Sequence, residues 1–126
     1  MRKNRIVLGL AGAGLVLATA IGTAGSAAAT TASPDQASSV CNYTNSEPFL
    51  SRGDTGTAVK QLQCELNYSL NPSLFTPLVV DGIFGQATSD AVYNFQGCVG
   101  IAQDRLVGSQ TWSKLDYWTV NPSYAC

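Results

Sequence analysis

The sequence predicts an all-α fold, a small three-helix bundle with turn-rich helix entries that is stapled by two disulfides. Three observations lead to this prediction: apolar residues at helical spacing, a corner motif that occurs twice, and four cysteines behind an export signal. The corner motif reads Asp, any residue, two apolar residues, Gly, two further residues and Thr. It occurs as DGIFGQAT from Asp81 and as DRLVGSQT from Asp104.

Residues 1–29 have the pattern of a secretory signal peptide. Three basic residues in the first five positions precede an apolar run from Ile6 to Ile21, and residues 27–29 form an A-x-A cleavage site. The run is short and broken by glycines, which disfavours a transmembrane helix. We therefore expect a secreted, extracellular protein with no membrane span after processing.

Removal of residues 1–29 leaves 97 residues, enough for one domain. Residues 30–40 are polar and small and are expected to form a flexible leader, so the domain is assigned to residues 41–126. The processed chain carries four Lys and Arg against eight Asp and Glu, a formal charge of −4. This charge argues against nucleic acid and anionic membranes as partners.

The four cysteines of an exported chain predict two disulfides, with three possible pairings. They are Cys41, Cys64, Cys98 and Cys126. A structural zinc site is not expected, because the chain has neither a CxxC pair nor a histidine. We expect no metal and no cofactor.

A first helix is expected within residues 52–70. Its apolar stripe consists of Val59, Leu62 and Leu66. Asp54 or Thr55 is expected to cap its start, and Pro72 follows its end.

Each corner motif is interpreted as the entry to a further helix. The second helix is expected at about residues 86–96 and a short third helix ends near Leu115, followed by a tail at residues 116–126. The motif residues given a structural role are Asp81, Gly82, Gly85, Thr88, Asp104, Gly108 and Thr111. These residues are expected to turn the chain and to form local hydrogen bonds with the backbone.

Three runs in the same order resemble the peptidoglycan-binding-like domain family, in the four-cysteine form exported by actinobacteria. They are GDTGTAVKQLQ at residues 53–63, DGIFGQATSDAVYNFQ at residues 81–96 and DRLVGSQTWSKL at residues 104–115, so the core motif spans residues 53–115. The resemblance implies a compact bundle of three helices that holds peptidoglycan, usually beside a catalytic domain. It also implies association with the cell wall.

Two features depart from the family pattern. Arg105 stands where a second Asp-Gly is usual, so the second turn must tolerate a side chain or use another geometry. The loop at residues 71–80 is longer and more apolar than the typical link, and it is expected to reshape any groove that it borders.

The resemblance, taken with helices packed side by side, favours one disulfide pairing. Cys41 and Cys126 flank the domain and are expected to join its ends, which leaves Cys64 to pair with Cys98.

An enzyme is not expected. The absence of histidine excludes the usual Ser-His and Cys-His nucleophiles and HExxH zinc sites. Glycosidases need only two carboxylates, but Glu65 and Asp90 are predicted to be solvated and Asp81 and Asp104 to be turn residues. None of these settings raises the pKa of a catalytic acid.

A binder of peptidoglycan needs exposed rings to stack on sugars and polar groups to bond amides. The ligand-binding candidates are Tyr93, Gln63, Gln96, Arg105, Trp112 and Trp118. Each has a structural alternative: an isolated surface ring for Tyr93, the core for Trp112, the core edge for Trp118, backbone bonding for both glutamines and open solvent for Arg105.

The sequence therefore predicts a secreted, non-catalytic module that binds peptidoglycan, as a monomer. A small disulfide-stapled effector or inhibitor that binds a protein partner is the alternative. A cryptic cell-wall hydrolase is a third hypothesis.

Overall fold

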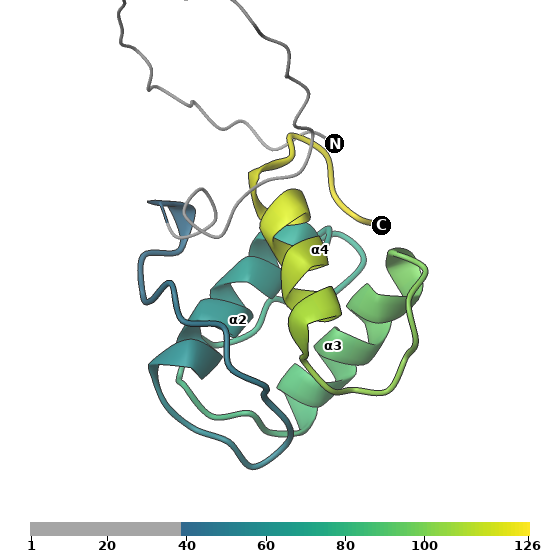
Figure 1. Cartoon of the computed structure of the whole chain (residues 1–126). Helices are drawn as coiled ribbons and strands as arrows, with labels where there is room; N and C mark the ends of the chain where they lie inside the picture. The colour runs from purple at the N-terminus through teal and green to yellow at the C-terminus, as the bar shows by residue number, and fades with distance from the viewer. Residues whose placement is uncertain (1–38) are drawn as a thin grey trace, which may run out of the picture.

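The computed structural model describes residues 39–126, and the predicted signal peptide and residues 30–38 of the predicted leader lie outside that range. Three helices form the body of the domain: α2 (Thr57–Ser69), α3 (Gln86–Cys98) and α4 (Ser109–Val120) (Figure 1). The predicted all-α bundle with two disulfides is confirmed. No helix within residues 39–126 is long and apolar enough to cross a bilayer.

The three helices enclose one core. Its buried members are Leu50, Val59, Leu62, Leu66, Leu70, Phe84, Val92, Phe95, Val107, Trp112 and Leu115. The predicted stripe of α2 is wholly buried, because the three residues share one face of the helix. Phe84 and Val107 are apolar positions of the two corners, so each corner contributes a side chain to the core. Burial of apolar side chains of this size contributes about 1.5–3 kcal/mol each to folding.

All three helices begin after a glycine and without a side-chain cap. Gly56, Gly85 and Gly108 are the N-cap residues of α2, α3 and α4. The prediction that Asp54 or Thr55 caps the first helix is wrong, since no side chain caps α2. Asp54 Oδ2 instead accepts a hydrogen bond from the Ser51 backbone N at 2.8 Å. The helix therefore starts at Thr57, within the segment that was predicted.

Helices α3 and α4 extend further than the sequence predicts. Helix α4 continues to Val120, so Trp118 belongs to its last turn and not to an irregular tail. Trp112, Leu115 and Thr119 lie at helical spacing and all three are buried. The buried face of α4 thus continues beyond Leu115, and packing sustains the additional turn.

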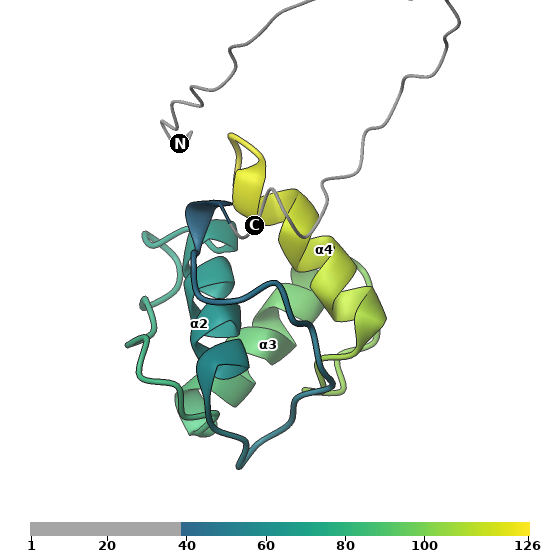
Figure 2. The same ribbon diagram turned by 60° about the vertical axis from the view of Figure 1, so that its left-hand side comes forward.

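The segment before α2 crosses both corners (Figure 2). Leu50 pairs with Val107 of the second corner in an antiparallel bridge, and Thr55 pairs with Ile83 of the first corner in the same manner. The two corners are therefore held side by side by one stretch of extended chain.

The predicted disulfide pairing is wrong. Cys41 is bonded to Cys64 and Cys98 to Cys126, with Cα–Cα distances of 5.8 Å and 5.5 Å. The N-terminal segment folds onto α2, because the Tyr43 backbone N donates to Gln61 Oε1 at 3.0 Å. The C-terminal segment returns to α2 through a hydrogen bond from Ala125 N to Ser69 O. Each end of the domain is consequently fixed to a neighbouring helix and not to the other end.

Candidate functional site

Gln63 of α2 organises the first corner. Its Nε2 donates to Asp81 Oδ1, to the Ile83 backbone O and to Thr88 Oγ1, each at 3.0 Å. Its Oε1 accepts from the Gly82 backbone N at 2.9 Å. The amide side chain therefore supplies hydrogen-bond partners to backbone groups that a tight turn leaves unpaired.

Gln96 of α3 performs the same task at the second corner. Its Nε2 donates to Asp104 Oδ1 at 2.9 Å, to the Leu106 backbone O at 2.9 Å and to Thr111 Oγ1 at 3.2 Å. Its Oε1 accepts from the Arg105 backbone N at 2.9 Å. The sequence repeat is therefore a repeat of one hydrogen-bond network, contact for contact.

The carboxylates of the two networks are held ionised. Asp81 Oδ1 also accepts from the Ile83 backbone N, and Asp104 Oδ1 from the Leu106 backbone N, each at 2.9 Å. These backbone bonds, followed by those from Gln63 and Gln96, lower the pKa of both carboxyls below the ordinary value of 3.8. The structural role predicted for the corner residues agrees with these contacts.

The two copies differ in the length of chain between glutamine and aspartate. Gln63 and Asp81 are 18 residues apart, whereas Gln96 and Asp104 are 8 apart. The first copy thus contains ten more residues than the second.

Arg105 adopts the conformation that glycine has in the first copy. Its φ is 65°, compared with 78° at Gly82. The second turn thus keeps the geometry of the first and tolerates a side chain, one of the two outcomes expected. The guanidinium pairs with Asp90 Oδ1 at 2.7 Å and lies 4.6 Å from the centre of the Tyr93 ring. Arg105 therefore covers part of the exposed face of α3.

A groove of about 520 Å³ lies between α2, α3 and the loop that joins them. Its apolar side chains include Leu66 and Leu70 of α2, Phe75 and Leu78 of the loop, and Ala91 of α3. Helix α2 packs more extensively on α4 than on α3, which leaves this space between α2 and α3. The expectation that residues 71–80 reshape a groove agrees with this arrangement.

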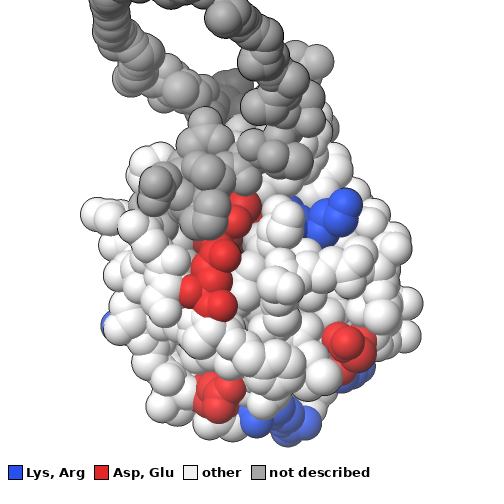
Figure 3. Space-filling view, in the orientation of Figure 1, with Lys and Arg blue, Asp and Glu red and all other residues white. Residues whose placement is uncertain are grey.

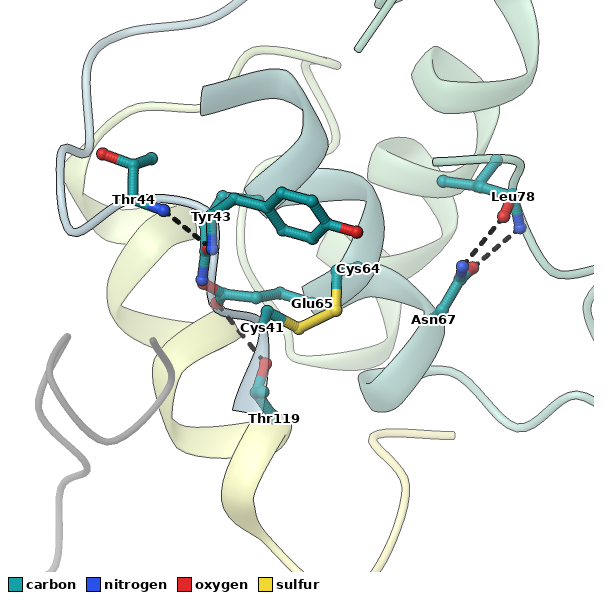
Figure 4. Close-up of a disulfide and its surroundings, with 9 residues drawn as sticks. Cys41, Tyr43, Thr44, Cys64, Glu65, Asn67, Leu78 and Thr119 are labelled. Atoms are coloured by element: carbon teal, nitrogen blue, oxygen red, sulfur yellow. Dashed lines mark hydrogen bonds between the residues drawn. A yellow bond between two sulfur atoms is a disulfide. The ribbon is translucent and has the colours of Figure 1, made fainter. Parts of the chain in front are cut away.

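Asn67 fixes the far wall of the groove. Its Nδ2 donates to the Leu78 backbone O at 2.9 Å, and its Oδ1 accepts from the Leu78 backbone N at 2.7 Å (Figure 4). The Asn67 side chain thus bonds both backbone groups of Leu78, as a neighbouring β-strand would, and fixes the apolar loop beside α2. Sequence reasoning missed Asn67, although its position on the same face as Gln63, four residues later, was a usable signal.

Three of the six ligand-binding candidates are buried, each with an exposed fraction of 1%: Gln63, Gln96 and Trp112. Trp112 Nε1 donates to the Pro48 backbone O at 2.8 Å, and both glutamine amides are committed to the corners. The prediction that Gln96 and Trp112 contact a ligand is corrected on this evidence, since both are buried outside the groove. Gln63 borders the groove, but its amide is committed to the first corner.

The other three candidates lie outside the groove. Tyr93 is exposed but lies against Arg105, and Trp118 is half-buried with its ring edge-on to Tyr117. None of the three is among the residues that line the groove. The candidate site is therefore the groove itself, which the sequence indicated only through its bordering loop.

A pair of buried carboxylates lies between α2 and α4. Glu65 and Asp116 have exposed fractions of 1% and 2%. Burial raises the pKa of Glu65 to about 7; burial, together with the charges of Glu65 and Glu47, raises that of Asp116 to about 8. Figure 3 shows acidic side chains gathered in a stripe on this face. The prediction that Glu65 is solvated is wrong.

Glu65 is anchored by neutral donors. Gln61 Nε2 donates to its Oε1 at 2.7 Å and Thr119 Oγ1 to its Oε2 at 3.4 Å. Asp116 Oδ1 has no hydrogen-bond partner among the described residues. Within residues 39–126, no three His, Cys, Asp or Glu side chains form a group that could hold a metal ion.

Known proteins are similar to this chain in sequence and in fold. A family model described as "Putative peptidoglycan binding domain" matches residues 55–115. An uncharacterized protein in the bpoA1 3' region of Kitasatospora aureofaciens is 52% identical over 96 residues, which cover 75% of each chain. The zinc D-Ala-D-Ala carboxypeptidase of Streptomyces albus G is 37% identical over 131 residues, which cover 98% of this chain and 50% of the enzyme.

A solved structure supports the same relationship. A peptidoglycan-binding protein from Clostridioides difficile, in complex with glutamine hydroxamate, superposes with a TM-score of 0.51 at 31% identity. The match covers 62% of this chain and 46% of that protein. The chain belongs to the peptidoglycan-binding domain family.

Proposed function

We propose that the chain is a secreted cell-wall protein that binds peptidoglycan through the groove between α2 and α3, and that it binds without cleaving. One observation carries the proposal: the groove of about 520 Å³ is built by the family-matched region, residues 55–115, around the first corner. A concave, largely apolar site with a few converging polar groups is the usual form of a ligand site.

Several side chains at the rim are suited to the amide-rich stem peptides of the wall polymer. Asn94 and Gln86 of α3 and Thr76 of the loop line the groove and carry amide or hydroxyl groups. Such groups both donate and accept hydrogen bonds, as the backbone of a peptide requires. A single site of this size is expected to bind weakly, so retention on the wall depends on the density of sites on the polymer.

The buried pair Glu65 and Asp116 does not favour a hydrolase. Raised pKa values are typical of catalytic acids. However, exposed fractions of 1% and 2% leave no access for a sugar or a peptide bond. The relative that is a carboxypeptidase is twice as long as the matched region, so its activity is no evidence for catalysis here.

Sedimentation with purified, protein-free peptidoglycan tests the proposal. We expect the processed protein to sediment with the polymer and to release no soluble muropeptides. Ala87→Arg places a long side chain at the groove, where Ala87 is exposed on α3, and should abolish sedimentation. Ser113→Arg, at an exposed position of α4 outside the groove, is the matched control and should sediment normally.

Two outcomes contradict the proposal. Protein that remains in the supernatant argues against peptidoglycan as the ligand, and equal sedimentation of both arginine variants argues against the groove. Tyr93→Ala and Trp118→Ala test the surface that the sequence had suggested. Their binding should be unchanged, because neither residue lines the groove.

A further inference from the structure

The groove carries an uneven charge. Nineteen residues line it, and they include Asp81 and Asp90 but neither lysine nor arginine. Arg105 pairs with Asp90, so among the described lining residues the negative charge without an ion pair is that of Asp81, which disfavours carboxylate and phosphate groups and favours a cation. The free carboxylates of a stem peptide and the phosphates of other wall polymers are therefore poor ligands for this site.

The two acidic residues are not equivalent. Asp90 already forms an ion pair with Arg105, in which Asp90 Oδ1 lies 2.7 Å from Arg105 Nη1. Asp81 is exposed, and its recorded hydrogen bonds, from Gln63 Nε2 and the Ile83 backbone N, both reach Oδ1. Because these donors are neutral and Asp81 has no ion pair among the described residues, its exposed carboxylate can accept a further, charged donor.

The walls of the groove suit an aliphatic chain. Leu66 and Leu70 continue along α2 from Gln63, which lies beside Asp81. From Gln63 to Leu70 is seven residues, about 10 Å along a helix. Leu66 and Leu70 are themselves buried, and the partly exposed apolar walls above them are Phe75, Leu78 and Ala91. Burial of a chain of methylenes against these walls would be favourable.

The lining does not favour a sugar ring. Stacking on a sugar needs an accessible aromatic face, and among the lining residues only Phe75 is aromatic. Its side chain is half-buried in the loop wall. The peptide part of peptidoglycan is therefore the better match.

We propose that the groove binds the diamino acid of the peptidoglycan stem peptide, with the methylenes of its side chain along the apolar walls and its primary ammonium on Asp81. This inference rests on the proposed function. This ammonium is lost where the side-chain amine has been acylated in a cross-link. The protein would thus distinguish stem peptides with a free side-chain amine from those whose amine is acylated.

Chemical modification of the polymer provides the first test. Acetylation of the amines of purified peptidoglycan removes their charge, whereas reductive methylation keeps it. We expect the processed protein to bind acetylated polymer about tenfold more weakly, and methylated polymer nearly as well as untreated polymer. Equal binding to acetylated and untreated polymer would overturn the inference but leave the proposed function intact. Failure to bind untreated polymer would instead overturn the proposed function.

The repeated network offers a matched pair of variants. Asp81→Asn keeps the oxygen that accepts from Gln63 and Ile83 and removes the charge, and Asp104→Asn makes the same change in the second copy, whose aspartate does not line the groove. We expect Asp81→Asn to weaken binding about tenfold and to bind acetylated and untreated polymer alike. Asp104→Asn should behave as the parent protein. Equal loss in both variants, or no loss in Asp81→Asn, contradicts the inference, and circular dichroism establishes that each is folded. If Asp81→Asn does not fold, the modified polymers decide alone.

Discussion

Gln63 of α2 and Gln96 of α3 hold equivalent positions in two copies of one hydrogen-bond network. Each amide donates to an aspartate, a backbone carbonyl and a threonine, and accepts from the backbone N of the residue after the aspartate. Both glutamines are 1% exposed, so no solvent replaces these bonds if the amide is lost. The network thus fixes the corners that shape the surface.

Removal of either amide should destabilise the domain. Gln63→Ala leaves the buried Gly82 N–H without its partner, and Gln96→Ala the partly buried Arg105 N–H, each at a cost of about 1–3 kcal/mol. The free energy of unfolding, measured by denaturant titration, should fall by that amount in each variant. The two losses should add, since the networks share no residue. A change below about 0.5 kcal/mol in both variants would contradict a structural role for the glutamines.

Stability should decrease as the pH rises from acid to mildly alkaline. The pKa values of Glu65 and Asp116 are raised from 4.5 and 3.8 to about 7 and about 8, chiefly by burial. Between these limits the folded protein holds more protons than the unfolded chain, so the free energy of unfolding falls with increasing pH. We expect a loss of at least about 2 kcal/mol between pH 5 and pH 8 in denaturant titrations, since each unit of raised pKa corresponds to about 1.4 kcal/mol.

Neutral isosteres identify the groups responsible for this pH dependence. Glu65→Gln and Asp116→Asn cannot ionise, so the stability of the double variant should be nearly constant over the same interval. The lowered pKa values of Asp81, Asp90 and Asp104 act below their ordinary value of 3.8, outside this window. Parent stability that increases from pH 5 to pH 8 would rule out the burial argument.

The equivalent positions Arg105 and Gly82 should differ in their sensitivity to substitution. Arg105→Gly relieves a left-handed conformation at φ 65° and loses an exposed ion pair, so stability should change by less than about 1 kcal/mol. Gly82→Ala should destabilise, because an added Cβ would lie 3.2 Å from Gly56 O and 3.3 Å from Lys60 Cγ. Thermal unfolding of the two variants measures the contrast, and a strongly destabilised Arg105→Gly would contradict it.

Loss of either disulfide should lower stability without changing the fold of the remainder. Replacing both cysteines of the Cys41–Cys64 bridge, or both of the Cys98–Cys126 bridge, by serine should cost about 2–4 kcal/mol. Non-reducing peptide mapping of the parent protein should recover these two pairs. Recovery of Cys41 linked to Cys126 would contradict the structure described here.

The helices were predictable because their apolar residues recur at helical spacing and because the corner motif marks two helix entries. The stripe Val59, Leu62 and Leu66 and the entry at Gly85 lie where these patterns place them. Helix ends were less predictable: α4 continues to Val120 because its additional turn is buried against α2, a tertiary effect.

The disulfide pairing and the site depended on contacts between distant segments. The position of Cys41 follows from the bond between Tyr43 N and Gln61, 18 residues apart, which no local pattern reports. The burial of Glu65 depends likewise on α4, whose Thr119 is 54 residues away. A helical wheel shows which residues share a face, but it cannot show which faces a neighbouring helix will cover.

The ten additional residues of the first copy have an evolutionary consequence. Both copies close their corners with the same glutamine, aspartate and threonine contacts, whatever length of chain lies between them. The scaffold therefore accepts this segment as an insert, and exchanging it alters the recognition surface together with the contacts that Phe75 and Leu78 make with the core. Homologues can diversify their specificity there by insertion and deletion, and an engineer can graft new loops at the same junction.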